Sequence, residues 1–432
     1  MRALITTLGL LVVSMTGCSS NKTEATPDNG AASAAPTASG APSPTASSAA
    51  LAVTSTPPIP DTPPGDAKHG RELVAKFECS RCHEVASVAP APTNKHCISC
   101  HQDLASGKLG AGNAEAPKWR EHTAHLRVVP TLADAGKRLR RGWIESYLLD
   151  PHDLRPSLTM TMPRLALTQE EARDIATFLA PDDAPDKTDA LAGASLEQGR
   201  ALTEKNGCGS CHAFTGVPAL PDARAASAKE TNEIFALAPD LRFARDRLRP
   251  EKLVAWLLDP KSLLPDARMP KFTLTPEQAR DVAAYVLKAP LAPLARTVPA
   301  RLPVLDRKVT YSEVEDRVLG VLCVHCHSEP RTSIGDGGPG NGGGFGFKPR
   351  RFDVGTYRGI SAGYLDAHGE RQSVFAPDPD GVPHLVAALL ARYGEEAGKP
   401  NPNVRGMPLG LPPLPLEDIQ LVESWIAQGR PQ

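Results

Sequence analysis

The 432-residue sequence has few methionines, no basic tract and almost no long apolar runs. The one apolar run near the N-terminus, residues 3–13, is too short to span a bilayer, and no other segment is long and apolar enough to cross a membrane. Basic and acidic residues nearly balance, with 48 Lys and Arg against 49 Asp and Glu. Without a basic tract, nucleic acid is not expected as a partner.

Cysteine is also scarce outside one repeated pattern. Eight of the nine cysteines lie in four copies of Cys-x-x-Cys-His, which is typical of c-type haem attachment. Two thiols add to the vinyl groups of one porphyrin, and the adjacent His binds the iron. The sequence therefore predicts four covalent haem c groups. The attaching residues are Cys79, Cys82, Cys97, Cys100, Cys208, Cys211, Cys323 and Cys326, and the proximal iron ligands are His83, His101, His212 and His327.

Two other interpretations of the cysteine pairs were weighed. Export would permit four disulfides, but four Cys-x-x-Cys disulfides would not each need a trailing His. The first two pairs come close to zinc-ribbon spacing, whereas the other two lie too far apart. The second pair, Cys97 and Cys100, therefore stays open to zinc or to a lost haem.

The N-terminus predicts export. Arg2 is followed by an apolar run over 3–13, which is typical of a signal-peptide core. Met15-Thr16-Gly17-Cys18 resembles a bacterial lipobox, which implies that 1–17 is a lipoprotein signal peptide and that the thiol of Cys18 is lipidated. An ordinary signal peptide with a chance Cys is the alternative. Ser19 favours the outer membrane, on the periplasmic side of a Gram-negative envelope. Residues 18–65, rich in Ala, Ser, Thr and Pro, predict a disordered tether.

An internal repeat organises the rest of the chain. Gly70-Arg-Glu-Leu73 ahead of Cys79 matches Gly199-Arg-Ala-Leu202 ahead of Cys208 at the same distance, and four later stretches also match. These are 138–140 with 247–249, 148–151 with 257–260, 162–163 with 269–270, and 167–174 with 274–281. A third, divergent copy begins near Tyr311.

The helix that closes each copy is also predicted. Thr168 with Glu171, and Thr275 with Gln278, are capping-box pairs that begin helices. Apolar residues then recur at helical spacing. In the third copy the closing helix is expected around 419–426. Each closing helix is expected to pack on the helix that precedes the haem motif.

The order of helix, Cys-x-x-Cys-His, loop, helix, Met-Pro and closing helix resembles the small monohaem cytochrome c family, repeated three times over 66–432. The resemblance implies an all-α fold with three tandem domains at 66–183, 190–291 and 300–432, the first carrying the extra haem. It also implies Met162, Met269 and Met407 as distal iron ligands. After removal of the leader only four Met remain, and these three precede Pro. Met160 is the spare.

The haem at Cys97 has no Met-Pro partner. Its motif lies in an insert that also contains His96, His122 and His125. We expect two imidazoles on this iron, with His125 or His122 as the distal ligand; His69 is a further candidate. His152, His325, His368 and His384 are expected to be solvated or hydrogen-bonded. A thioether raises the reduction potential and a second imidazole lowers it, so one low-potential haem is expected beside three of higher potential.

A glycine-rich run and a basic cluster also indicate contacts with haem. The glycine-rich run 335–347 is expected to lie against a flat haem face, with phosphate binding as the alternative. The basic cluster at 137–141, echoed at 245–249, is expected to partner haem propionates or to form a solvated helix face. A docking patch for an acidic redox partner is a further alternative.

Together these features predict a lipid-anchored tetrahaem cytochrome that passes single electrons between redox proteins of the cell envelope. No catalytic residue is assigned. The alternative is a haem enzyme, peroxidase-like or another small-molecule reductase, with an open coordination site on the haem at Cys97 and Cys100. A third hypothesis is a bound subunit of a larger respiratory complex.

Overall fold

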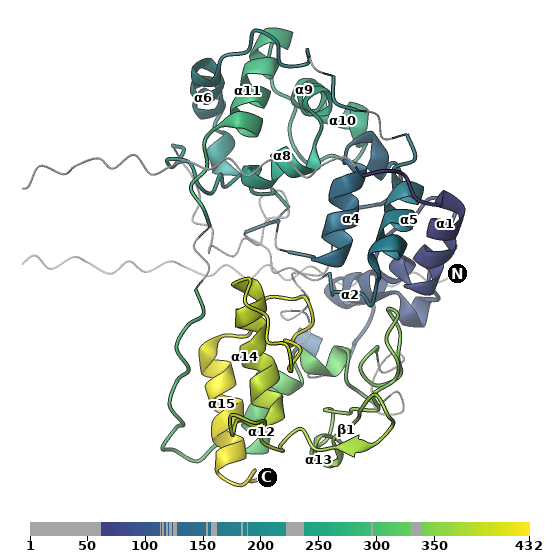
Figure 1. Ribbon diagram of the computed structural model, residues 1–432, viewed down its shortest axis with the longest axis vertical. Coiled ribbons are helices and arrows are strands. Elements are labelled where there is room, and N and C mark those ends of the chain that lie inside the picture. The colour runs from purple at the N-terminus through teal and green to yellow at the C-terminus, as the bar shows by residue number, and fades with distance from the viewer. Residues whose placement is uncertain are drawn as a thin grey trace, which may run out of the picture. The chain divides into compact units, whose positions relative to one another are not determined.

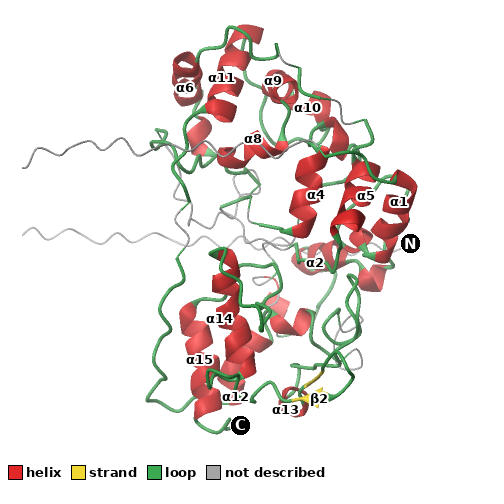
Figure 2. Ribbon diagram, viewed as in Figure 1, coloured by secondary structure: helices red, strands yellow, loops and turns green. Residues whose placement is uncertain are grey.

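The computed structural model describes residues 62–112, 114, 116–117, 120, 123, 128–152, 154–156, 162–182, 185–187, 189–221, 237–294, 297–329 and 338–432. The leader, Cys18, nearly all of the tether, Met160, His122 and His125 lie outside these residues. Within them the chain is mainly helical, with one small antiparallel sheet that pairs β1 (Tyr364–Leu365) with β2 (Arg371–Gln372) (Figure 2). None of the described helices has the length and apolar character needed to cross a membrane.

The first helical section, residues 62–182, is built from α1 (Ala67–Lys76), α2 (Cys97–Ala105), α4 (Arg141–Leu149) and α5 (Gln169–Leu179). Helix α5 begins with the expected capping box, in which Thr168 and Glu171 bond each other's backbone N–H groups. Helices α1, α4 and α5 enclose one hydrophobic core, of which Phe77 and Ile175 are among the most deeply buried members. Figure 1 shows α1 beside α5.

The second helical section, residues 189–294, repeats this plan. It contains α6 (Leu196–Lys205), α8 (Ala244–Arg247), α9 (Pro250–Leu258), α10 (Pro260–Leu263) and α11 (Pro276–Lys288). Its closing helix α11 also starts with the expected capping box, from Thr275 and Gln278, with Pro276 in the first turn, where its missing N–H costs nothing. Its core joins α6, α9 and α11 around Leu253, Val282 and Val286.

The first two sections cross their main helices in the same way. A Cβ on Gly70 would lie 2.0 Å from the carbonyl oxygen of Asp174, and a Cβ on Gly199 would lie 2.0 Å from that of Asp281. The N–H groups of Asp66 and Ser195 each donate to the carboxylate of the same two aspartates, both at 2.8 Å. The sequence expectation that the closing helix packs on the helix before the motif is confirmed for both sections.

The third helical section, residues 297–432, contains α12 (Tyr311–Val314), a π-helical turn (Glu315–Leu319), α13 (Tyr357–Ala362), α14 (His384–Glu396) and α15 (Leu416–Ala427). The expected closing helix is α15, and its Trp425 is fully buried. Trp425 lies 5.7 Å from Tyr311 and 6.2 Å from Tyr357 between ring centroids. Aromatic side chains therefore fill the core of this section.

Candidate haem-binding site

Three of the four Cys-x-x-Cys-His motifs fold into the same tight turn. They form the 3-10 turns Cys79–Arg81, Cys208–Ser210 and Cys323–His325. In each turn the His N–H donates to the carbonyl of the first Cys, at 2.9–3.0 Å.

The second motif differs, because it forms the first turns of helix α2 (Cys97–Ala105). His96 is the residue that caps this helix, and its Nδ1 accepts a hydrogen bond from the Ser99 N–H at 3.1 Å. This imidazole, an uncommitted candidate from the sequence, therefore has a structural function.

All eight described cysteines are free. Cys82 of the first motif and Cys97 of the second are within hydrogen-bonding reach of each other, and this contact raises the pKa of the Cys82 thiol. Among the described residues no group of three or more His, Cys, Asp or Glu side chains is arranged to hold a metal ion. The geometry thus offers no zinc cluster between these two motifs.

The proximal histidines of the first and third motifs are oriented by matching carbonyl groups. His83 Nδ1 donates to the Pro130 carbonyl at 2.8 Å, and His212 Nδ1 donates to the Pro239 carbonyl at 2.7 Å. A carbonyl only accepts, so Nδ1 carries the proton and Nε2 keeps the lone pair that an iron needs. Burial lowers the pKa of both imidazoles, which favours the neutral form that binds metal.

His327 of the fourth motif lies against the glycine-rich loop. A Cβ on Gly340 would be 2.1 Å from His327 Nδ1, so only glycine fits beside this ring. Phe352 contacts the same ring edge-on, at 5.0 Å between centroids. Burial lowers the pKa of His327 to about 4. The described part of the loop, from Gly338, packs on the motif and its histidine, in a place for which the sequence had predicted contact with a haem face.

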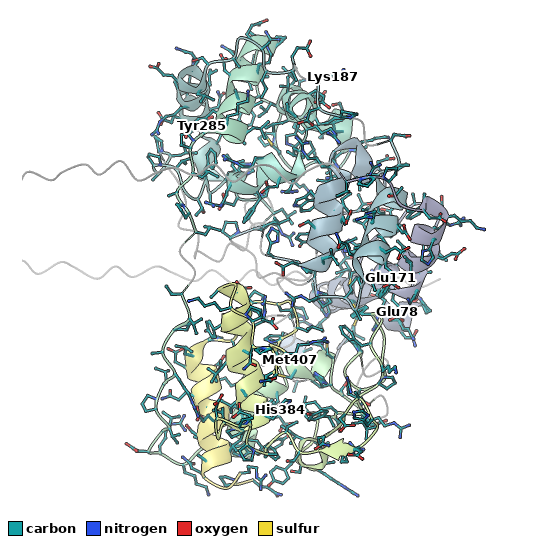
Figure 3. All side chains as sticks on the ribbon, in the orientation of Figure 1. Glu78, Glu171, Lys187, Tyr285, His384 and Met407 are labelled. Atoms are coloured by element: carbon teal, nitrogen blue, oxygen red, sulfur yellow. The ribbon has the colours of Figure 1, made fainter. Side chains whose placement is uncertain are left out.

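The three Met-Pro methionines lie at the edges of the three cores, each partly buried. Trp256 Nε1 donates to Met269 Sδ at 2.9 Å, which holds this thioether in place. The N–H of Met407, labelled in Figure 3, donates to the Ala388 carbonyl of α14 at 2.8 Å. No pattern in the sequence predicted these two hydrogen bonds at Met269 and Met407.

The remaining predicted histidines separate into different environments. His69 Nδ1 bonds the Asp174 carboxylate at 2.7 Å, which raises the pKa of His69. This contact commits its Nδ1 to the helix crossing. His384 stacks on Tyr364 at 5.5 Å between ring centroids. His325 lies with its ring centroid 6.2 Å from that of His101, a juxtaposition that the sequence had not suggested.

The two basic clusters contain buried arginines, whereas Lys137 of the first cluster is exposed. Arg140 and Arg249, which are repeat mates and both buried, donate to the two carboxylate oxygens of Asp186 at 2.7 and 2.6 Å. The Arg140 N–H also donates to the Arg247 carbonyl at 2.9 Å. Although burial opposes it, hydrogen bonding from both arginines lowers the pKa of Asp186. Sequence analysis missed Asp186 because no repeat mate or motif marks it.

Arg247 stands out among the basic residues of the second cluster. Burial lowers its pKa to about 10, and its guanidinium lies 5.2 Å from the centroid of the Trp143 ring. Its Nε has no hydrogen-bond partner, and neither does that of its repeat mate Arg138. Two partly buried guanidinium groups, each with a buried Nε that lacks a partner, fit the expected role as partners of anionic propionates.

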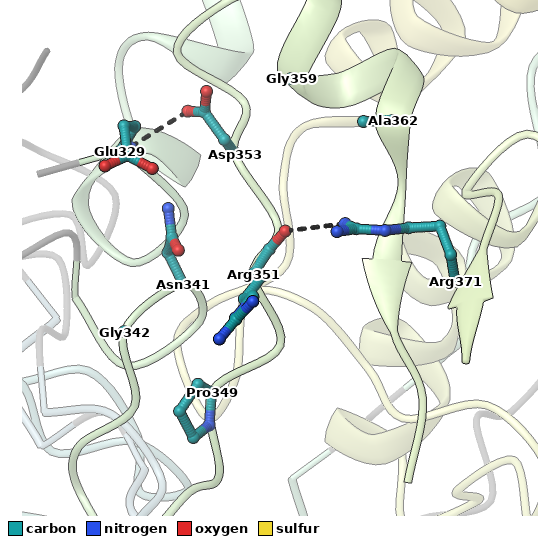
Figure 4. A pocket seen from close by; sticks show the side chains of 9 residues that line it. All are labelled: Glu329, Asn341, Gly342, Pro349, Arg351, Asp353, Gly359, Ala362 and Arg371. Carbon is teal, nitrogen blue, oxygen red and sulfur yellow. Dashed lines mark hydrogen bonds between the residues drawn. The ribbon is translucent and has the colours of Figure 1, made fainter. Parts of the chain in front are cut away.

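A polar pocket of about 560 Å³ lies beside the fourth motif (Figure 4). Asp353 accepts from the Glu329 N–H, and Arg371 donates to the Arg351 carbonyl, so its walls are held by hydrogen bonds. None of the predicted haem ligands lines it. This pocket is therefore separate from the candidate iron sites.

The family model of cytochrome c matches the chain in two segments, residues 90–181 and 196–290. The first segment includes the motif at Cys97 and leaves Cys79 outside. By their glycine crossings, however, the helix before Cys79 is the structural equivalent of the helix before Cys208. No curated protein and no solved structure matches the chain. Free paired thiols, buried neutral imidazoles and a glycine against His327 fit a covalently bound haem. The tandem match to the cytochrome c family model implies haem c and supports a c-type cytochrome that transfers electrons.

Proposed function

We propose that this protein is a tetrahaem c-type cytochrome that relays single electrons between redox proteins of the cell envelope. In this proposal the three helical sections are three cytochrome c domains, the first of which carries two haems. The match to tandem cytochrome c domains supports the haem chemistry, and the four motifs supply the count.

The convergence of the motifs carries the proposal. Cys82 of the first motif contacts Cys97 of the second. His101 of the second lies 6.2 Å from His325, inside the fourth, between ring centroids. The fourth motif, which is far along the chain from the first two, thus lies next to them. A relay needs its redox centres close together, whereas independent haem domains would have no reason to juxtapose their attachment turns.

The third motif is connected to the others through backbone contacts. The carbonyl that orients His212 belongs to Pro239, and the N–H of the next residue, Asp240, donates to the Leu154 carbonyl of the first section at 2.9 Å. The two ion pairs of Asp186 with Arg140 and Arg249, called here the Asp186 clasp, join the same two sections. These contacts favour a fixed arrangement of the second section against the first.

The proposal assigns a role to each predicted site residue. The cysteine pairs would hold the porphyrins, and His83, His101, His212 and His327 would bind the irons. Met162, Met269 and Met407 would supply thioether ligands. Each bound haem supplies the reversible one-electron chemistry of its iron. The carbonyl groups of Pro130 and Pro239 fix two of the imidazoles, so that their geometry is the same in both redox states.

The location is part of the proposal. The leader, with Arg2 and the apolar run 3–13, and the lipobox-like Met15-Thr16-Gly17-Cys18 support export and lipidation of Cys18. Attachment of haem c takes place after export, so the two features agree. The tether of residues 18–65 would connect the folded sections to an outer-membrane anchor on the periplasmic side.

The haem count and the relay are tested together on the purified holoprotein. Intact mass should show four added haems, and Cys97→Ser with Cys100→Ser should remove one. Rapid reduction by a small donor should then reduce all four haems of the wild type from one point of entry. A count of two haems, restricted to the matched segments, would overturn the tetrahaem proposal.

The second candidate function is a haem enzyme with an open site on the haem at Cys97, as in peroxide or small-molecule reduction. It is favoured by the departure of that motif, which begins a helix rather than a 3-10 turn, and by the absence of a Met-Pro partner. The oxidised wild type would then show one high-spin haem and turn over peroxide. Four low-spin haems without turnover support the relay instead.

A further inference from the structure

We propose that His325, the residue between the two cysteines of the fourth motif, is the second axial ligand of the haem attached at Cys97 and Cys100. The inference rests on the proposed four-haem function. It replaces His125 or His122, the expected ligands, with a residue from another section of the chain. It also gives a function to an imidazole that the sequence left as solvated or hydrogen-bonded.

The separation of the two imidazoles carries the inference. Their ring centroids are 6.2 Å apart, with an angle of 67° between the ring planes. An imidazole nitrogen binds a transition metal at about 2.0 Å and lies about 1 Å from the centroid of its own ring. Two imidazoles on opposite sides of one iron therefore have centroids about 6 Å apart. The rotation of each ring about its bond to iron is free, so the angle is compatible.

The backbone around His325 is closely packed. His325 ends the 3-10 turn of the fourth motif, where the His327 N–H bonds the Cys323 carbonyl at 2.9 Å. Gly338, with a positive φ of 65°, packs so closely that a Cβ would lie 2.3 Å from the His325 carbonyl oxygen. The glycine-rich loop thus packs directly against the backbone of His325, the residue that we assign as the ligand.

The same loop continues onto the first section. The Phe345 carbonyl accepts from the Ala166 N–H at 3.1 Å, and a Cβ on Gly346 would lie 2.4 Å from the ring of Phe77. Phe77 is fully buried in the core of the first section. The turn that bears His325 is therefore held next to the section that bears His101.

Arg81 connects this loop to the second motif. Its guanidinium lies 5.3 Å from the centroid of the Phe345 ring, and its Nε donates to the Lys95 carbonyl at 3.2 Å, two residues before Cys97. Arg81 is buried, and it occupies the same position in the first motif that His325 occupies in the fourth. One side chain thus holds both the start of α2 and the loop behind His325.

Among the other described candidates, His96 uses the Nδ1 lone pair to cap α2 through Ser99. His69 bonds Asp174 through Nδ1, which leaves its Nε2 able to bind a metal, so His69 is a further arm of the experiment. His122, His125 and Met160 lie outside the described residues, so they enter as arms of the experiment. With His325 as ligand, a single turn attaches one haem through Cys323 and Cys326 and ligates the iron of another. The attachment turn itself then connects the two centres.

The test is axial-ligand spectroscopy on holoprotein variants. His325→Ala should convert one of the four low-spin haems to a high-spin form in the electron paramagnetic resonance spectrum, and added imidazole should restore the low-spin signal. His325→Met should keep all haems low-spin and raise the potential of one, because a thioether favours Fe(II). His368→Gln, at an exposed surface histidine, is the matched control and should leave both readouts unchanged.

The outcomes separate this inference from the proposed function. Four haems by mass with an unchanged spectrum in His325→Ala would overturn the ligand assignment alone. The same follows if His69→Ala, His122→Ala or His125→Ala produces the high-spin haem, or if the wild type already contains one. Three haems by mass, with none at Cys97, would overturn the four-haem proposal and the ligand assignment together.

Discussion

The first and second helical sections cross their two main helices over a glycine, whereas the third places a valine at that point. Gly70, Gly199 and Val314 each lie nine residues ahead of the first Cys of their motif. The two glycines allow the backbones to touch at Asp174 and Asp281. Val314 is instead fully buried in the aromatic core of the third section. The same attachment turn is therefore supported by two different kinds of helix packing.

The difference shows what a motif requires and what its surroundings supply. The motifs at Cys79, Cys208 and Cys323 fold into 3-10 turns in all three sections, whereas the motif at Cys97 begins α2, so the motif alone does not determine the turn. The family match covers parts of the two glycine sections and leaves out the valine section. The first matched segment also leaves out α1 and Gly70, so the match does not depend on the glycine crossing.

The largest expected effect comes from exchanging the crossing residues. Gly199→Val would force α6 and α11 apart, because even its Cβ would lie 2.0 Å from a backbone oxygen. We expect a loss of about 3 kcal/mol in the free energy of unfolding. Val314→Gly should cost a similar amount, about 3 kcal/mol, through a cavity and a poorer helix former. Thermal unfolding of the holoprotein, followed by circular dichroism, measures both.

Ala201→Ser, on the exposed face of α6, is the matched control and should change stability little. If Gly199→Val were tolerated as well as this control, the close crossing would not be what stabilises the second section. If Val314→Gly were neutral, the contrast between the sections would disappear.

A smaller effect is expected from the Asp186 clasp, which joins the repeat mates Arg140 and Arg249. Asp186→Asn removes the charge that satisfies two buried guanidinium groups, and should cost about 2 kcal/mol, because Asp186 itself is partly exposed. The pKa of Asp186 is lowered in the folded state. The stabilisation is therefore present above the unfolded-state value and is lost only as the pH falls through the folded-state value.

Double-mutant cycles that pair Asp186→Asn with Arg140→Met, and separately with Arg249→Met, sharpen the comparison of the two sections. Equal coupling energies are expected if the clasp is symmetric. Asp189→Asn, at an exposed aspartate nearby, serves as the control. Coupling energies near zero in both cycles would show that the clasp contributes nothing.

The smallest effect separates the first section from the second. His69 bonds Asp174, whereas the matching residue in the second section is Gln198. The pKa of His69 is raised in the folded state. Its contribution is thus present below the unfolded-state value, about 6.5, and disappears as the pH rises through the folded-state value.

His69→Gln should therefore lower the melting temperature slightly at about pH 5.5 and leave it unchanged at about pH 8.5. Gln198→Glu changes the equivalent position of the second section, which has no histidine, and serves as the matched control. A melting difference for His69→Gln that grew with pH would contradict the assigned ion pair.

Much of the fold could be predicted from the sequence because local signals decide it. The capping boxes at Thr168 and Thr275 mark the starts of α5 and α11, and the spacing of Gly70 and Gly199 from their cysteines marks the helix crossing. Each of these signals acts within a few residues or recurs in the repeat. For that reason they can be recognised in a single sequence.

The contacts between sections could not be predicted in this way. Asp186 has no repeat mate, and His325 looks like a variable residue inside a motif. Their partners, Arg140, Arg249 and His101, lie 46 to 224 residues away along the chain. No periodicity or local propensity connects residues over such distances. The sequence therefore pointed to the nearby histidines of the insert as distal ligands of the second haem.

The contact between Cys82 and Cys97 has a consequence for how the protein matures. Cys82 and Cys97 belong to two different attachment sites and lie within reach of each other, so a two-electron oxidant acting on both thiols would join them in a disulfide between motifs. That bond would remove one thiol from each of two attachment sites at once. Assembly of the first section therefore requires either a reductant that keeps both cysteines as thiols or attachment of the first haem before the segment containing Cys97 folds onto it.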